Sequence, residues 1–591
     1  MARISLALLA LCVTCVALAL LAEPRHAQDG GRSTFVPEPE AALSARIDVE
    51  IDKVLKRDGV KAAARASDEQ FLRRVYLDTV GAPPTITEAR AFLDSRQPDK
   101  REKLIDALVD DPRFARHMAN EWSVLLTPRS DQALNGGHLF AQWLAGRIRE
   151  NAGMHSIIRE IVTASGELVD NAAIVPYFAD GQGELPTNVI GKLSRGLTGV
   201  QIQCAECHDH PYDPDFSQKD FQGMTAFVVA ARGNVDNRYQ PARISLRDDP
   251  SVPKRVLDAK KRYASLNKEQ QAQVDFYLPY VTPVTPDGTA ADTRDPANWR
   301  NKLAAWMTDD ANVQTRRYVA NRVWAIAFGS GLLNPVDDFN PVNEASHPEL
   351  LDALADDLKA NQWSLKRLYR AILKSQTWQR ASTPAKGAQR WHFASYPVRQ
   401  LTSEQFINTL IGLLSEKQLA DLVQTSRDAG LDRAMADLKT REAADRKAGN
   451  TYTQYDHNAL ARFAEQFKAM DARWWITRWA AGRYASISGD DEMTASEGFT
   501  QTIDQALAVM NGQFTNSLAG RGEDSLLRRI VAEYPEAQRV EALYLTILSR
   551  KPSEAESARL SKHFAEAKDK TAAAEDLLFA LLMTTELATN H

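Results

Sequence analysis

Cysteine is scarce in this chain of 591 residues, which has four, and neither sign of charge is in large excess. Four cysteines are too few for a fold of this length to be stabilised mainly by disulfides, which excludes a disulfide-rich protein. The 72 Lys and Arg against 77 Asp and Glu give a formal net charge of −5, so bulk charge gives no sign of nucleic-acid binding. Hydrophobic residues make up 44% and charged residues 25%, which excludes a disordered or collagen-like chain. We therefore expect a globular protein that binds no nucleic acid.

Long apolar runs are also missing, except at the start of the chain. Arg3 supplies a positive charge, residues 6–22 are apolar apart from Thr14, and Ala27 is a small residue suited to cleavage. This layout predicts a secretory signal peptide over residues 1–27, although a run of about 17 residues also permits an uncleaved anchor. We expect an exported protein, periplasmic or associated with the cell envelope, with no membrane span after cleavage.

Cleavage of the signal peptide would reduce the number of cysteines in the exported chain. Cys12 and Cys15 lie inside the leader, so the exported chain would keep only Cys204 and Cys207. Two thiols three residues apart cannot be part of a larger disulfide framework.

Runs of alternating β-branched residues and repeats of fixed period are absent as well, whereas helix start signals are common. Residues 28–44 are rich in Gly, Pro and acids and predict a tether. Ser67, Thr85 and Asp99 each precede an apolar stripe at helical spacing, as helix-capping residues do. The sequence therefore predicts a helical domain over residues 45–232.

Residues 233–298 differ in composition, because Pro, Asp and Gly are dense there, and they predict a linker between two domains. A short strand is possible at 276–284. Residues 299–591 are again helical in pattern, with predicted helix starts at Ser346 and Ser364. The predicted fold class is mainly α: two helical domains joined by a Pro/Asp-rich linker, with minor short β elements.

One motif carries explicit chemistry. Residues 204–210 read Cys-Ala-Glu-Cys-His-Asp-His, and their core is C-x-x-C-H, the attachment sequence for c-type haem. Two thiols at this spacing can each reach one vinyl group of a porphyrin, and the adjacent imidazole can then hold the iron. The motif predicts a covalent haem c on Cys204 and Cys207, with His208 as its iron ligand.

Two alternatives use the same residues. A redox-active or structural disulfide would need only Cys204 and Cys207. A zinc site could add His208 and His210, although adjacent ligands at 207 and 208 make a closed tetrahedron awkward.

The second iron ligand is not determined by the motif. Met224 lies sixteen residues after His208, and its thioether would raise the reduction potential of the iron relative to a second histidine. Met224 also shares a helical face with Phe221, which favours ordinary core packing. A five-coordinate site is a further possibility, and the remaining candidates in the same half are His117, Met118, His138 and His155.

Signals for a catalytic site are weaker. Asp337 and Asp338 could bind a cation or act as acid and base, but two acids between prolines are typical of turns. His347 is expected at the N-terminus of a helix. The sequence has no G-x-S-x-G, Walker A, H-E-x-x-H or dinucleotide-binding fingerprint, so it predicts no catalytic residue.

Longer stretches resemble two known families. The N-terminal half resembles the planctomycete cytochrome C-like family, domain of unknown function 1549, in FLRRVYLDTVGAPPTITEARAFL and GVQIQCAECHDHPYDPDFSQKDFQGMTAFV. The C-terminal half resembles the planctomycete-specific partner family, domain of unknown function 1553, in NRVWAIAFGSGLLNPVDDFNP, MTASEGFTQTIDQALAVMNGQF and VEALYLTILSRKPSEAE. The resemblance implies an exported protein of Planctomycetes or related bacteria whose C-x-x-C-H is Cys204, Cys207 and His208, and it implies no known reaction.

Three functional hypotheses follow. The first is an exported protein that carries one covalent c-type haem and transfers electrons to or from a redox partner protein. The second is a non-enzymatic helical scaffold or binding protein with a C-x-x-C disulfide. The third is a metal-dependent hydrolase that uses the Cys and His cluster, with Asp337 or Asp338.

Overall fold

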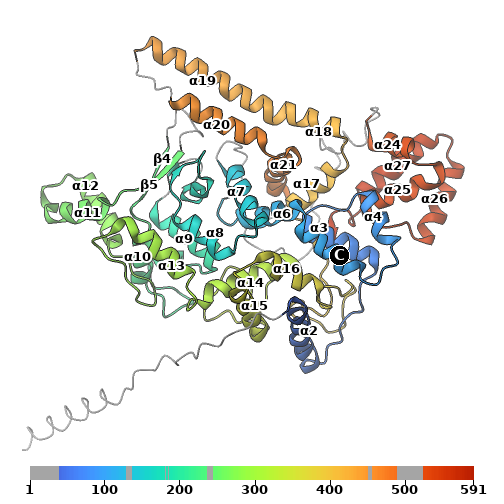
Figure 1. Ribbon diagram of the computed structural model, residues 1–591, viewed down its shortest axis with the longest axis horizontal. Helices are drawn as coiled ribbons and strands as arrows, with labels where there is room; N and C mark the ends of the chain where they lie inside the picture. The colour runs from blue at the N-terminus through green and yellow to red at the C-terminus, as the bar shows by residue number, and fades with distance from the viewer. Residues whose placement is uncertain are drawn as a thin grey trace, which may run out of the picture. The chain divides into compact units, whose positions relative to one another are not determined.

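Helices account for most of the computed structural model, and its strands are short (Figure 1). The predicted signal peptide lies outside the described residues, and the predicted tether gives way to helix α2 at Glu40. Within the described part of the chain, no helix is both long and apolar enough to cross a membrane. The structure describes residues 39–127, 136–179, 182–183, 185–235, 244–449, 455–488 and 524–591.

The N-terminal region is built from helices, and three of them begin directly after the predicted residues Ser67, Thr85 and Asp99. Ser67 accepts a hydrogen bond from the backbone N–H of Gln70, and Thr85 forms a reciprocal capping box with Glu88. Asp99 precedes a helix as predicted but makes no capping hydrogen bond. The helices are α2 (Glu40–Arg57), α3 (Asp68–Val80), α4 (Ile86–Leu93), α5 (Lys100–Asp110), α6 (Pro112–Ser123), α7 (Gly137–Arg149), α8 (Met154–Val162), α9 (Pro186–Thr198) and α10 (Gln218–Ala226).

The predicted linker, residues 233–298, contains secondary structure of its own. It holds β5 (Ile244–Asp248), α11 (Val252–Lys261) and α12 (Lys268–Tyr277), and β5 pairs with β1 (Gly166–Glu167) and β4 (Ala231–Val235) in an antiparallel sheet of order β1-β5-β4. The predicted strand at 276–284 is wrong. Helix α12 runs on to Tyr277 and a 3₁₀ turn follows at Leu278–Tyr280, so the apolar run there packs as a helix end.

The C-terminal region, residues 299–591, is also helical. Ser364 caps its helix as predicted, but Ser346 does not, because α15 begins at Pro348 with His347 as N-cap. The Ser346 hydroxyl donates instead to the Leu332 carbonyl at 2.9 Å. The helices are α13 (Trp299–Met307), α14 (Val313–Phe328), α15 (Pro348–Ala360), α16 (Leu365–Lys374), α17 (Ser403–Gly412), α18 (Glu416–Val423), α19 (Ala429–Lys447), α20 (Tyr455–Ala469), α21 (Ala472–Ser488), α24 (Leu526–Glu533), α25 (Glu536–Leu548), α26 (Glu554–Glu566) and α27 (Lys570–Leu582).

Two further pairs of short strands and one π-helical turn occur in the described part of the chain. The strand pairs are β2 (Phe178–Ala179) with β3 (Gln182–Gly183), and β6 (Arg399–Gln400) with β7 (Thr589–Asn590). A π-helical turn, Gln424–Asp428, joins α18 to α19.

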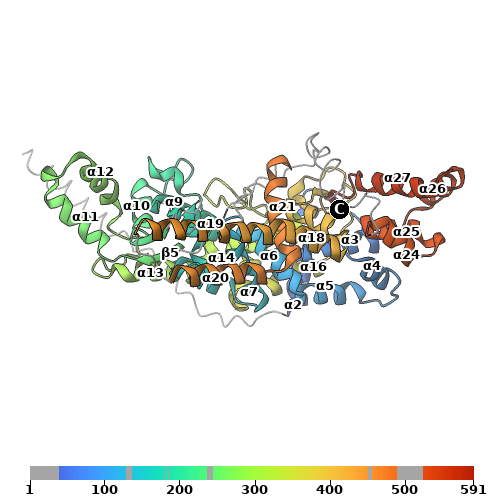
Figure 2. The same ribbon diagram turned by 90° about the horizontal axis from the view of Figure 1, so that it is seen from above.

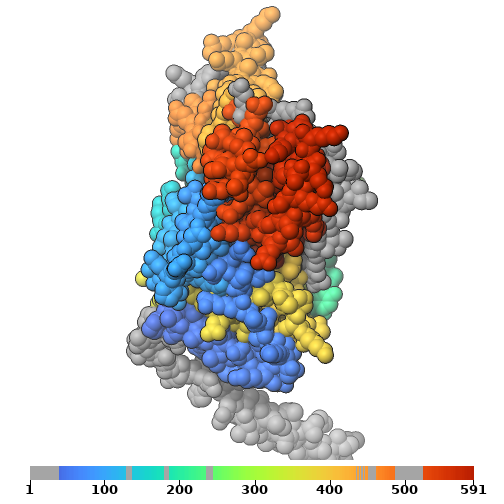
Figure 3. Space-filling model, turned by 90° about the vertical axis from the view of Figure 1, so that its right-hand side faces the viewer, coloured from blue at the N-terminus to red at the C-terminus, as the bar shows by residue number. Residues whose placement is uncertain are grey.

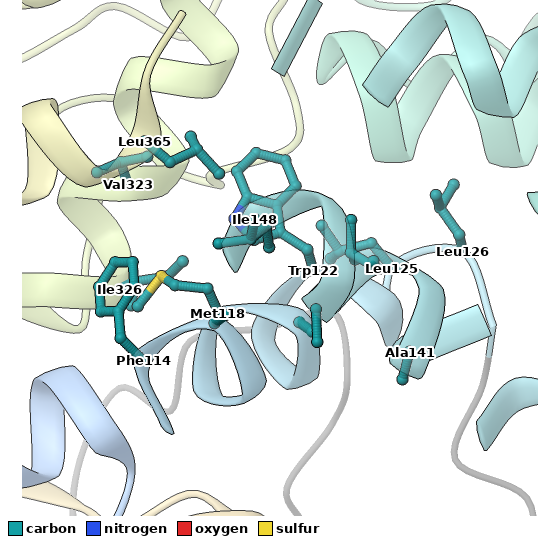
Figure 4. Close-up of a cluster of buried hydrophobic side chains, with 14 of the residues drawn as sticks. Phe114, Met118, Trp122, Leu125, Leu126, Ala141, Ile148, Val323, Ile326 and Leu365 are labelled. Carbon is teal, nitrogen blue, oxygen red and sulfur yellow. The ribbon is translucent and has the colours of Figure 1, made fainter. Parts of the chain in front are cut away.

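Helices of the N-terminal and C-terminal regions share one hydrophobic core. Helix α2 packs against α15 and α16, α8 against α13, and α9 against α14. In both ribbon views α24–α27 lie beside α3 and α4 (Figures 1 and 2). Figure 4 shows the part of this core in which α6 and α7 meet α14 and α16, through Phe114, Met118, Trp122, Ala141, Ile148, Val323, Ile326 and Leu365.

A buried carboxylate joins the two regions. Asp78 of α3 has no exposed surface, and it forms an ion pair with Arg399. Tyr396 donates to it at 2.9 Å, and Asn590 donates at 2.6 Å. A buried charge is tolerated only when it is paired and hydrogen-bonded, so residues far apart in the chain must come together here.

We predict that Arg399→Met destabilises the protein by about 3–5 kcal/mol, because it leaves the Asp78 charge buried without its cation. Urea unfolding followed by circular dichroism measures this loss. The matched control is Arg294→Met, which breaks a fully exposed ion pair with Asp292 and should leave the free energy of unfolding nearly unchanged. Equal losses for the two variants would show that the buried pair does not stabilise the fold.

Candidate functional site

The C-x-x-C-H motif begins in one short helix and ends just after it. Gln203–Glu206 form a 3₁₀ helix, η2, with Cys207 as its C-cap. Since a 3₁₀ helix has three residues per turn, the side chains of residues i and i+3 are eclipsed. Cys204 and Cys207 are both exposed, and both are free thiols. They can therefore react together with one molecule that approaches from solvent.

His208 follows directly, and its ring has a defined tautomer. Its Nδ1 lies 2.7 Å from the carbonyl oxygen of Asp209. Because a carbonyl only accepts, Nδ1 must carry the proton and donate, which leaves the lone pair on Nε2. The residue is exposed. A histidine that donates from one nitrogen to a carbonyl and offers the other is in the state that metal ligation requires.

His210 is in the opposite situation. It is 9% exposed, its Nε2 lies 2.9 Å from the Gln201 carbonyl, and its Nδ1 accepts from the backbone N–H of Tyr212. Both ring nitrogens are occupied by these hydrogen bonds, so His210 shapes the loop. Among the residues that the structure describes, no group of three His, Cys, Asp or Glu side chains could hold a metal ion. The zinc alternative with His210 as a ligand is therefore not supported.

The first residue of helix α10 is hydrogen-bonded to the motif. The backbone N–H of Gln218 donates to the Asp209 carboxylate at 2.9 Å, and the Gln218 side chain donates to the Glu206 carbonyl at 2.9 Å. The His210 backbone N–H donates to Phe216 at 2.9 Å. These hydrogen bonds join residues 206–210 to residues 216–218 and so fix the backbone next to the two cysteines.

Met224 lies on α10 but does not share the exposure of the motif. Its side chain is 2% exposed and belongs to the hydrophobic core together with Phe221 and Phe227. Core packing therefore accounts for Met224, as its helical spacing suggests.

The other predicted candidates for the second iron ligand are also engaged elsewhere. His117, Met118 and His138 are buried, and His155 packs against Trp363. Burial lowers the pKa of His117 to about 4 and that of His138 to about 3, so both imidazoles are neutral at physiological pH.

Asp337 and Asp338 have structural partners. Asp337 is 1% exposed and pairs with Nε of Arg195 at 2.6 Å. Asp338 accepts from the side-chain amides of Asn340 and Asn343 at 3.0 Å each, as expected for a turn. Sequence reasoning missed Arg195, because its partner lies 142 positions away and no local pattern signals the pair.

The Arg195 ion pair fixes helix α9, which leads into the motif. At the end of this helix Gly199 has φ +71°, and a Cβ there would lie 2.3 Å from the ring of Tyr318. Only glycine permits both the left-handed backbone and this close approach. The C-terminal region thus sets the position from which the chain enters η2.

The donor set fits the covalent attachment of a porphyrin. Two exposed thiols three residues apart could each bind one vinyl carbon, and Nε2 of His208 could bind the iron. Asp209 and Gln218 hold the loop in this arrangement.

Two parts of the chain match known protein families. Residues 46–232 match the family described as PSCyt2, a protein of unknown function (DUF1549), and residues 299–564 match PSD1, a protein of unknown function (DUF1553). The chain belongs to the planctomycete proteins that join these two domains, and its N-terminal region is a cytochrome c-like domain of unknown function. No curated protein and no solved structure matches it.

The buried histidines predict a loss of stability in mild acid. Below pH 6.5 His117 and His138 become protonated in the unfolded chain but stay neutral in the folded protein. The free energy of unfolding therefore falls by about 1.4 kcal/mol per pH unit for each histidine. For His138 this contribution is complete above about pH 6.5 and is lost progressively as the pH falls toward its folded pKa of about 3.

We predict that His138→Phe, which suits the ring's place between Phe467 and Trp475, makes the fall in stability between pH 7 and pH 5 shallower. Urea unfolding at the two pH values measures the slope. The exposed His563 provides the control His563→Phe, which should leave the slope unchanged. Identical slopes for His138→Phe and the parent chain would contradict the prediction.

Proposed function

We propose that this protein carries one c-type haem, bound through thioethers to Cys204 and Cys207 with His208 as axial ligand, and that it transfers single electrons. The observation that carries the proposal is the pair of exposed cysteines, Cys204 in η2 and Cys207 at its C-cap, next to a histidine whose Nδ1 donates to a carbonyl. A disulfide scaffold needs neither the histidine nor its tautomer.

Attachment requires no oxidant. Each thiol adds across one vinyl group, so that a carbon–sulfur bond forms and the thiol hydrogen goes to the neighbouring carbon. Both cysteines must be reduced for this addition, and both are exposed. When bound, haem supplies one-electron chemistry at its iron, tuned by the axial ligand.

The residues around the motif orient the His208 imidazole and the two thiols. The Asp209 carbonyl accepts from Nδ1 of His208 and so makes Nε2 a better electron donor to a metal. His210 and Gln218 keep the loop closed, so the thiols and the imidazole keep their mutual positions.

Exposure of the motif suits exchange with another protein. Cys204, Cys207 and His208 all lie at the surface, so a redox partner protein could approach a haem bound there directly. The signal-peptide pattern at residues 1–27 supports export, and haem attachment to C-x-x-C-H takes place outside the cytoplasm. We therefore place the protein in the periplasm or at the cell envelope.

The proposal predicts a Soret band that depends on three residues. The full chain, produced with its leader in a host with haem-attachment machinery, should show the band and retain it after denaturation in acid acetone. Replacing both Cys204 and Cys207 by Ser should abolish the covalent haem, and His208→Ala should alter the spectrum of what is bound.

His210→Gln is the matched control, because it changes the neighbouring histidine that we assign to the loop, and it should retain the covalent haem. A parent chain that shows no Soret band, and whose mass is two hydrogens below that of the chain with two free thiols, would favour the scaffold with a C-x-x-C disulfide.

A separate prediction concerns Met224. Since its side chain packs in the core, Met224→Leu should leave the visible spectrum and the reduction potential of the bound haem unchanged. Spectroelectrochemical titration of both proteins measures this. A fall of the potential in the variant would show that the thioether binds the iron.

A further inference from the structure

A cavity of about 480 Å³ lies where helix α3 meets the C-terminal region. Figure 3 shows the red C-terminal helices beside blue N-terminal residues. The volume falls within the range of about 300–1,000 Å³ that is common for small-molecule sites. None of the lining residues belongs to the C-x-x-C-H loop. Helix α3 contributes Glu69, Gln70 and Arg73, and the C-terminal region contributes Leu548, Arg550 and Glu586.

Arg73 brings a positive charge to this cavity without an anionic partner. The residue is 1% exposed, and its Nε and Nη2 donate to the backbone carbonyls of Glu586, Leu587 and Thr589 at 2.8–3.4 Å. Its Nη1 is buried and has no hydrogen-bond partner among the described residues. Burial lowers the pKa of Arg73 to about 10, so the guanidinium is still charged at physiological pH. A buried charge is costly unless it is paired, so Nη1 is suited to an anionic acceptor.

The nearby ionisable groups do not neutralise Arg73. Arg550 binds both carboxylate oxygens of Glu586, at 2.7 and 2.9 Å, and both of Glu556, at 2.8 and 2.9 Å. The Glu586 carboxylate is therefore engaged by Arg550. His591 also lines the cavity, and because burial lowers the pKa of its imidazole, the ring is neutral at physiological pH.

Glu69 lies one helical turn before Arg73 and lines the same cavity. A Glu four residues before an Arg in a helix ordinarily forms an ion pair with it. In the described part of the chain these two side chains form none, because Arg73 donates to the carbonyls named above. The Glu69 carboxylate accepts from the backbone N–H of Lys551 at 3.4 Å. Helix α3 thus brings one anion and one cation to the cavity, and neither is paired.

These two charges define the chemistry of a ligand. Phosphate would bring more than one negative charge close to Glu69 and Glu586, and an amine would leave Arg73 without its acceptor. A zwitterion with one carboxylate and one ammonium group satisfies both charges. An α-amino acid carries the two groups on the same carbon, which suits side chains one turn apart, whose Cβ atoms are about 5–6 Å apart.

We propose that this cavity binds a free α-amino acid, whose carboxylate accepts from Nη1 of Arg73 and whose ammonium donates to Glu69. Gln70 lines the cavity as well, and its side-chain amide can both donate to the ligand and accept from it. The bound carboxylate supplies the anion that the buried guanidinium lacks. The site is separate from the haem proposed above, and its test does not depend on haem attachment.

Thermal unfolding of the purified full chain in the presence of each proteinogenic amino acid tests the proposal. At least one amino acid should raise the Tm in a saturable manner, and calorimetric titration should then give one site per chain. The N-acetyl derivative of this amino acid lacks the ammonium, and its methyl ester lacks the carboxylate. Each derivative should bind at least about 10-fold more weakly than the parent amino acid.

Glu69→Gln removes the anion and keeps the size of the side chain. It should weaken binding of the same amino acid at least about 10-fold. The matched control is Glu102→Gln, which removes an exposed carboxylate from the first turn of α5, outside the cavity, and it should leave the affinity unchanged. Arg73→Met should abolish binding. If that variant fails to fold, Glu69→Gln and the two derivatives still decide the question.

Several outcomes would overturn the proposal. They are the absence of any amino acid that binds, derivatives that bind as tightly as the parent amino acid, or an affinity that Glu69→Gln leaves unchanged. Inorganic phosphate that binds as tightly as the best amino acid would overturn it as well, because the cavity would then take a simple anion.

Discussion

One fully buried carboxylate, that of Asp78, constrains the rest of the structure. It needs donors on several sides, and the chain supplies them from Arg399, Tyr396 and Asn590. These residues lie more than 300 positions away in sequence, so α3 and the C-terminal region must fold against each other for the charge to be satisfied. Residues of the two family domains therefore contribute to one continuous hydrophobic core.

Contacts between the N-terminal and C-terminal regions also fix the helix that precedes the C-x-x-C-H motif. Arg195 of α9 pairs with Asp337 of the C-terminal region, and the Tyr318 hydroxyl donates to the Gly196 carbonyl at 3.1 Å. Helix α9 is fixed by these contacts, and η2, which contains Cys204 and ends before Cys207, follows it in the chain. A site that must bind two vinyl carbons and one iron needs such a fixed backbone, because its three donor atoms have to meet one rigid ligand.

The sequence was informative where local chemistry decides the structure. Thr85 and Ser364 begin their helices as predicted, because N-capping depends on residues within one turn. It failed at Ser346, whose hydroxyl is taken by the distant Leu332 carbonyl. The motif was likewise visible from spacing alone. The His208 tautomer and the Arg195–Asp337 pair were not, since they depend on contacts that form only in the folded chain.

The central claim is that Cys204 and Cys207 carry one covalent haem, and the mass of the proteolytic peptide that contains both cysteines tests it most directly. The protein should be exported by a host with haem-attachment machinery before digestion. The account predicts a peptide heavier by one haem, with neither cysteine open to alkylation afterwards. A peptide without added mass, whether both thiols alkylate or the two are joined as a disulfide, would contradict it.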